Sequence, residues 1–100
     1  MTLSELLNAV KDENLPLEKI ERYRDELIHL HSAMQIELGE KEKEEALYFL
    51  KHSAPDVSDV SIKRKWRGTE SGQRAIILNR YIKAVAKEID SLKSRVYRLV

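Results

Sequence analysis

The sequence contains no cysteine, and its 100 residues include only two prolines and three glycines. The lack of cysteine excludes disulfide bonds and thiolate metal sites, and it favours an intracellular protein. All-β chains need a turn about every 8–12 residues, and glycine and proline form many of these turns. Their scarcity therefore argues against an all-β fold and in favour of long helices.

Long apolar runs and cofactor-binding motifs are also absent. No segment approaches the roughly 18 consecutive apolar residues of a membrane span. The opening residues Met1–Glu5 lack the basic and apolar regions of a secretory signal, so we expect a cytoplasmic protein. There is no phosphate loop, nucleophile elbow or dinucleotide glycine fingerprint. We therefore expect no cofactor, no membrane association and no enzymatic activity.

Charged residues make up 35% of the chain, against about 25% in an average domain. This balance suits long helices with one apolar stripe and a wide solvated face. The length predicts a single helical domain over residues 1–100. The charges are unevenly divided: residues 1–52 hold 7 basic and 12 acidic side chains, and residues 53–100 hold 11 basic and 5 acidic ones. The basic half can attract the acidic half within the fold, or an anionic partner.

Two helices are predicted in the first half of the chain. Thr2–Glu5 has the spacing of a capping box and leads into apolar residues at helical spacing, so a short helix is expected at about 3–13. Pro16 is well placed to open a second, long helix over 16–52. Gly39 and the charged turn after it could interrupt this helix, but the high helix propensity of the Glu/Lys stretch favours a continuous one.

The last helix is predicted at about 70–99, after a basic connection over 53–72 in which Ser58 could begin a short helix and Thr69 or Ser71 could cap the last one. Its apolar residues form a heptad, with mainly β-branched residues at a and mainly leucine at d, which favours two-stranded association. The residues expected at an oligomer interface are Leu78, Ile82, Val85, Ile89, Leu92 and Val96.

The same heptad has a second interpretation, because the helix that packs against it can also belong to the same chain. Further apolar residues widen the stripe beyond a strict two-position seam, which favours a bundle. The last helix would then pack antiparallel against the second helix of the same chain. The predicted fold is therefore all-α, with a short N-terminal helix and two long antiparallel helices. They form a helical hairpin or bundle, and a coiled-coil oligomer remains an open alternative.

The most distinctive local feature is the basic run Lys63-Arg64-Lys65-Trp66-Arg67 in the connection. Lysine and arginine neutralise phosphates, and a tryptophan face can stack on an unpaired base. The predicted nucleic-acid-binding residues are Lys63, Arg64, Lys65, Trp66, Arg67 and Arg74. The alternative is that Trp66 closes the end of the core while the basic side chains interact with the acidic second helix of the same chain.

The histidines and acidic clusters do not predict a metal or catalytic site. His29 and His31 point about 200° apart on a helix, so they cannot share a metal ion. Glu26 and His29 have the Glu-x-x-His spacing of di-iron bundles, but no second copy exists. The acidic pair Glu44–Glu45 lacks the further carboxylates of helical pyrophosphohydrolases. We therefore predict no catalytic and no metal-binding residues.

The chain has a long helix with Tyr23 through His31-Ser32, a charged connection, and a final helix ending in Ile89-Asp90-Ser91-Leu92-Lys93-Ser94-Arg95. Over about residues 20–97 this layout resembles small helical tailed-phage accessory proteins, including recombination mediators of the UvsY type. Those mediators oligomerise and bind single-stranded DNA while they help to load a recombinase. The resemblance therefore implies a phage or mobile-element origin.

Together these patterns predict a non-enzymatic accessory protein that oligomerises through its long helices and contacts single-stranded nucleic acid, as a recombination mediator does. The rival prediction is a protein–protein interaction module, such as an inhibitor, adaptor or assembly subunit. In that case the charged faces would bind another protein, and nucleic acid would have no role.

Overall fold

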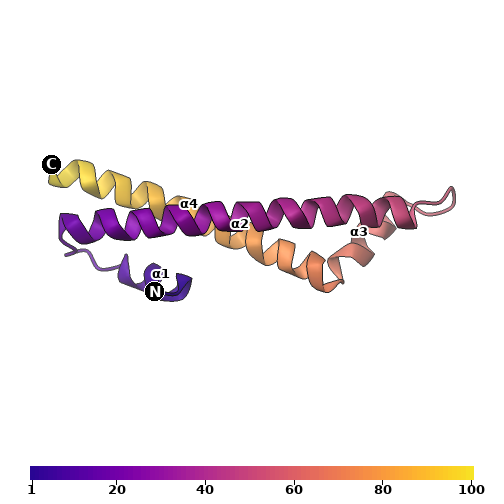
Figure 1. Cartoon of the computed structure of the whole chain (residues 1–100), viewed down its shortest axis with the longest axis horizontal. Coiled ribbons are helices and arrows are strands. Elements are labelled where there is room, and N and C mark those ends of the chain that lie inside the picture. The colour runs from indigo at the N-terminus through magenta and orange to yellow at the C-terminus, as the bar shows by residue number, and fades with distance from the viewer. The chain divides into compact units, whose positions relative to one another are not determined.

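The computed structural model describes residues 1–100, which form four α-helices and no strand. The helices are α1 (Leu3–Ala9), α2 (Leu17–His52), α3 (Asp59–Arg67) and α4 (Glu70–Leu99) (Figure 1). The predicted all-α fold is confirmed, since a short N-terminal helix accompanies two long helices that pack against each other. None of the four helices combines the length and the hydrophobicity that a membrane crossing requires.

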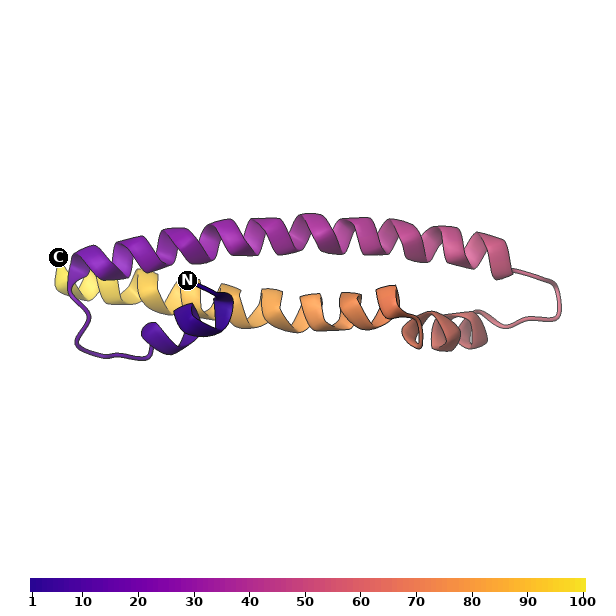
Figure 2. The same ribbon diagram turned by 60° about the horizontal axis from the view of Figure 1, so that its bottom comes forward.

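The residues cluster into two compact units, and both long helices contribute to each of them. Unit 1 comprises Met1–Met34 and Tyr81–Val100, and therefore contains α1, the first part of α2 and the last part of α4. Unit 2 comprises Gln35–Arg80, and contains the remainder of α2 and α4 together with α3. Within each unit the segments of α2 and α4 run antiparallel (Figure 2).

The first helix begins with the predicted capping box. The Thr2 hydroxyl accepts a hydrogen bond from the Glu5 amide (3.2 Å), and the Glu5 carboxylate accepts one from the Thr2 amide (3.1 Å). α1 ends at Ala9, earlier than predicted, because the amides of Lys11 and Asp12 bond to carbonyls three residues back. These shorter bonds form a turn that does not continue the α-helix.

Arginine 95 fixes this turn to the last helix. Its guanidinium donates from Nη1 to the Val10 carbonyl (2.8 Å) and from Nη2 to the Asp12 carbonyl (2.5 Å). Carbonyls at a helix C-terminus lack hydrogen-bond donors within the helix, and Arg95 supplies donors to two carbonyls that follow α1. One side chain thereby secures the end of α1 to α4.

The core of unit 1 joins all three of its helices. Its α2 residues follow helical spacing, and its α4 residues belong to the predicted heptad. The buried side chains are Leu6, Val10, Ile20, Tyr23, Leu27, Val85 and Leu92. Burial of a large apolar side chain is worth about 1.5–3 kcal/mol, so this cluster is the main source of stability in unit 1.

Unit 2 has a much smaller interior. Its buried apolar side chains are Ile62, Trp66 and Leu78. α2 runs without a break through Gly39, as predicted, and a Cβ atom at this glycine would meet no atom within 4 Å. Other large apolar residues of unit 2 lie at the surface, namely Ile36, Leu47, Leu50, Val60 and Ile77.

Candidate nucleic-acid interface

The basic run lies on a helix, α3, and not in an irregular connection. Ser58 caps its N-terminus, since its hydroxyl accepts a hydrogen bond from the Ser61 amide (3.1 Å). Asp59 in the first turn complements the helix dipole. Ile62 and Trp66, four residues apart, are both buried and anchor one face of the helix. The opposite side of α3 is thereby turned to solvent.

A tight corner connects α3 to α4. Thr69 caps α4: its hydroxyl accepts from the Gly72 amide (3.0 Å) and donates to the Trp66 carbonyl (2.6 Å). Gln73 also donates from its side chain to the Arg67 carbonyl. A Cβ atom on Gly72 would lie 1.9 Å from the Trp66 carbonyl oxygen, so no larger residue fits here without a backbone shift. These contacts fix the angle between α3 and α4.

Trp66 lies in the interior of unit 2, with 5% of its surface exposed. Its ring is tilted by 55° against the ring of Tyr48, with 5.5 Å between centroids, and Tyr48 in turn stacks on His52 at 4.0 Å. An indole buried in this way presents no open face to a base. This corrects the expected stacking role, and it agrees with the alternative that Trp66 closes the core.

The four basic residues of the run all lie at the surface of α3. They are Lys63, Arg64, Lys65 and Arg67. None of them has a carboxylate within 4.0 Å. The ion pairs of the protein join other residues, namely Lys41 with Glu44 and Arg74 with Glu37. With about 100° between successive residues of a helix, the four side chains fan out over the solvent-facing side. No acidic residue lies between Asp59 and Glu70, so the patch has one sign of charge.

Two of these cations border a groove beside α2. The groove has a volume of about 280 Å³, and Lys63 and Arg67 lie along it with Lys41, Glu42 and Glu45 of α2. Lys41 itself is paired with Glu44 at 3.5 Å. The acidic second helix therefore faces part of the basic run, although at a distance that leaves the cations of α3 without ion pairs.

Arg74 is placed differently from the other predicted basic residues. Its guanidinium donates to both carboxylate oxygens of Glu37, at 2.6 and 2.9 Å. This side-chain hydrogen bonding lowers the pKa of Glu37. A bidentate arginine–carboxylate pair has a fixed geometry, so Arg74 serves to join α4 to α2 within unit 2.

The predicted oligomer seam is occupied by the chain itself. Leu78, Val85 and Leu92 have no exposed surface, and Ile82, Ile89 and Val96 are half-buried. Val85 and Leu92 belong to the core of unit 1, against which Ile89 and Val96 pack. The seam therefore follows the intramolecular alternative, and these side chains are not available to a second chain in this fold.

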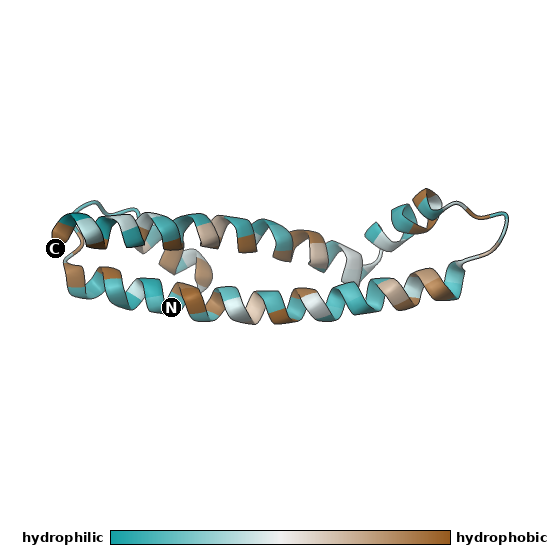
Figure 3. Cartoon of the chain, turned by 90° about the horizontal axis from the view of Figure 1, so that it is seen from above, coloured by the Kyte–Doolittle hydropathy of each residue, from teal (hydrophilic) through white to brown (hydrophobic).

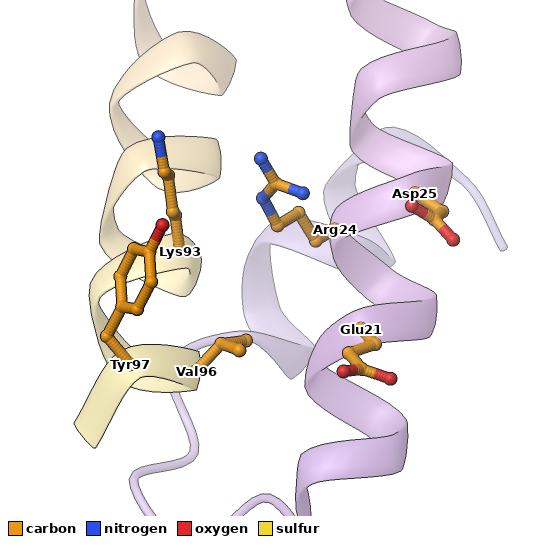
Figure 4. Close-up of a pocket in the computed structure, with 6 residues that line it drawn as sticks. All are labelled: Glu21, Arg24, Asp25, Lys93, Val96 and Tyr97. Atoms are coloured by element: carbon orange, nitrogen blue, oxygen red, sulfur yellow. The ribbon is translucent and has the colours of Figure 1, made fainter. Parts of the chain in front are cut away.

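Unit 1 contains a second groove, of about 430 Å³, that the sequence did not suggest. Arg24 projects from α2 toward Lys93 and Tyr97 on α4, while Asp25 points away (Figure 4). The Nε atom of Arg24 is buried and has no hydrogen-bond partner. Glu21 and Asp25 on the same rim balance the two cations, so the groove has no net charge.

No group of three or more histidine or carboxylate side chains is arranged to hold a metal ion. Of the histidines, His52 bonds through Nδ1 to the Tyr48 carbonyl at 2.9 Å, in the last turn of α2. No protein-family model, curated protein or solved structure matches the chain. The charges and surfaces of the two units are therefore the basis on which a function can be proposed.

Proposed function

We propose that this chain is a non-enzymatic accessory protein that binds the phosphate backbone of single-stranded nucleic acid through the solvent-facing side of α3. The observation that carries the proposal is a set of four exposed cations on one short helix, with no carboxylate within 4.0 Å of any of them. The binding residues are Lys63, Arg64, Lys65 and Arg67. Trp66 is not among them, because it is buried.

The geometry favours a contact that does not depend on sequence. Lysine and arginine side chains that fan out from a helix can neutralise phosphates, but base recognition needs side chains held against base edges in a groove. The exposed side of this 9-residue helix carries four long, flexible cations, which suit contacts to phosphates. A flexible single strand can adapt its phosphates to the four cations.

Salt dependence gives a quantitative test. If four phosphates of a single strand are neutralised, the logarithm of the binding constant should fall with the logarithm of salt concentration with a slope of about −3. Polarisation of a fluorescent oligonucleotide, titrated at several salt concentrations from about 50 mM upward, measures this slope. A slope near zero, or no binding at about 50 mM salt, contradicts the proposal.

A matched pair of variants assigns the contact to α3. Replacement of Lys63, Arg64, Lys65 and Arg67 by glutamine should abolish the salt-dependent binding. A control with the same charge change replaces four exposed lysines outside α3: Lys11, Lys19, Lys51 and Lys87. If both variants weaken binding equally, net charge and not the α3 surface attracts the nucleic acid. Circular dichroism verifies that both variants keep their helices.

A protein–protein interaction module is the second candidate, and the apolar surface of unit 2 favours it. Leu50 and Val60 are exposed by 77% and 68%. Exposed apolar side chains that gather in one part of a molecule often mark a binding surface. A stoichiometric complex with another protein, formed without nucleic acid and unaffected by the α3 variant, would favour this candidate over the first.

A further inference from the structure

The side of α2 opposite the groove in unit 2 carries large apolar side chains. Ile36, Leu47 and Leu50 are exposed by 67%, 59% and 77%. At about 100° per residue, all three point roughly 180–240° away from Lys41, which lines the groove beside α3. The chain's own helices therefore leave this face uncovered.

These residues belong to a regular pattern. Ile36, Glu40, Lys43 and Leu47 are spaced by four, three and four residues, and all four are exposed; Leu50 extends the row by one turn. This is the spacing of alternating a and d positions in a coiled coil. In the hydropathy colouring, α2 is mixed near its middle, is largely hydrophilic over the turns that follow, and has hydrophobic turns again near its C-terminal end (Figure 3).

We propose that this face of α2 is the docking site for a second copy of the chain, which lies antiparallel to the first. In a two-fold antiparallel pair of helices, an a position of one chain faces a d position of the other. One register then places Ile36 against Leu47 of the partner subunit, and Glu40 against Lys43 of the partner subunit. Each of these contacts occurs twice.

The self-complementarity of the row identifies the partner. The register that pairs apolar with apolar residues also pairs the acidic Glu40 with the basic Lys43, and no further adjustment is needed. A parallel pair would instead place Glu40 against Glu40 and Lys43 against Lys43, which repel each other. This one face of α2 therefore provides both the apolar pairing and the opposite-charge pairing when it meets the same face of a second copy. No other protein is needed as the partner.

Gly39 offers a supporting observation. Glycine inside a helix is less stable than alanine by about 0.5–1 kcal/mol, so it usually has a reason. Nothing in the chain itself lies within 4 Å of the position that a Cβ atom would take at Gly39. This glycine borders the row, next to Glu40, where a small residue lets a second helix approach closely.

The first test is the mass of the purified protein in the absence of nucleic acid, measured by sedimentation equilibrium over about 1–500 µM. The row from Ile36 to Leu50 is only about 22 Å long, so we expect a weak dimer with a dissociation constant in the micromolar range. Leu47→Ser removes an apolar contact twice per dimer and should weaken it at least ~100-fold. A wild-type protein that stays monomeric at about 500 µM contradicts the proposal.

Charge reversal tests the register. Glu40→Lys alone places lysine against Lys43 of the partner subunit, and Lys43→Glu alone places glutamate against Glu40 of the partner subunit. Each variant should dimerise roughly 10-fold more weakly. An equimolar mixture of the two, or the double variant in one chain, restores opposite charges and should restore dimerisation. A dimer that neither single reversal weakens is not assembled in this register.

A matched control uses Lys87→Glu and Asp90→Lys on α4. These two exposed residues are three apart and change the net charge as the α2 reversals do. They should leave the dimer unchanged, and an equal loss would show that net charge alone controls association. The masses are measured without nucleic acid, so this inference and the proposed binding by α3 can fail independently of each other.

Discussion

The two units share α2 and α4 but use these helices in different ways. In unit 1, the apolar residues Ile20, Tyr23 and Leu27 of α2 are buried with α1 and α4 in one cluster. In unit 2, the apolar residues Ile36, Leu47 and Leu50 of the same helix are exposed. One continuous helix therefore buries its large apolar residues in its first part, whereas its second part also exposes several of them.

This difference indicates a division of roles. A unit with a large apolar cluster can hold a fixed structure, whereas a unit with a small interior and exposed apolar and basic side chains is suited to binding. Both surfaces that we propose for partners, the basic side of α3 and the outer row of α2, lie in unit 2.

The largest expected effect comes from shortening equivalent leucines in the two units. Leu92 in unit 1 and Leu78 in unit 2 occupy the same heptad position of α4, and both are fully buried. Leu92→Ala should lower the free energy of unfolding by about 3–5 kcal/mol, and Leu78→Ala by about 2–3 kcal/mol. The second loss is smaller because unit 2 has a smaller interior, whose neighbouring side chains can move into the cavity more easily. Urea unfolding followed by circular dichroism measures both. A larger loss for Leu78→Ala would overturn the comparison.

A medium effect is expected from adding one methyl group at each of two glycines of unit 2. Gly72→Ala forces Cβ against the Trp66 carbonyl and should lower the free energy of unfolding by about 1–3 kcal/mol. Gly39→Ala meets open space and should raise it by about 0.5–1 kcal/mol. Thermal unfolding in dilute solution can be followed by the fluorescence of Trp66, the only tryptophan. If Gly72→Ala is as stable as the wild type, the corner of unit 2 is not fixed by this contact.

The smallest expected effect concerns the ion pair that joins α2 and α4 in unit 2. Arg74 lowers the pKa of Glu37 below its ordinary value of 4.5. A lowered carboxyl pKa stabilises the fold above the unfolded-state pKa, and this contribution is lost as the pH falls through the folded-state pKa. Arg74→Gln should raise the pKa of Glu37 in an NMR titration and remove this contribution.

The pair is exposed, so its effect on stability is small. It is present above about pH 5 and disappears as the pH falls and the carboxyl becomes protonated, so stability is compared over this range of pH. Arg80→Gln is the matched control, since Arg80 is an exposed arginine on the same helix and has no ion pair. It should leave the titration of Glu37 unchanged. An equal shift in both variants would assign the low pKa to the general charge of α4.

Much of the fold could be predicted because it depends on neighbours in the sequence. The capping box at Thr2, the caps at Ser58 and Thr69, and the continuity of α2 through Gly39 follow from hydrogen bonds and propensities within a few residues. The end of α1 was predicted too late, because the turn after Ala9 is held by Arg95, a residue far away in the sequence.

Of the candidate site, the sequence predicted only the position of its basic residues. The basic run itself is visible in the sequence, but the burial of Trp66 depends on Tyr48 and on the close approach of Gly72 to the α3 backbone. Likewise, the pairing of Arg74 with Glu37 joins residues that are 37 positions apart. No local pattern distinguishes a basic residue that forms such a pair from one that remains available to a ligand.

Periodicity and capping act over one or two turns, so the amino-acid sequence is enough to predict that the protein is helical and where its long helices run. Which helix faces are covered depends on the packing of distant segments. The heptad of α4 is filled by the chain's own side chains, whereas the row on α2 that begins at Ile36 is left open. The physical reason is that an apolar stripe favours burial against any complementary surface, and its sequence does not specify whether that surface belongs to the same chain.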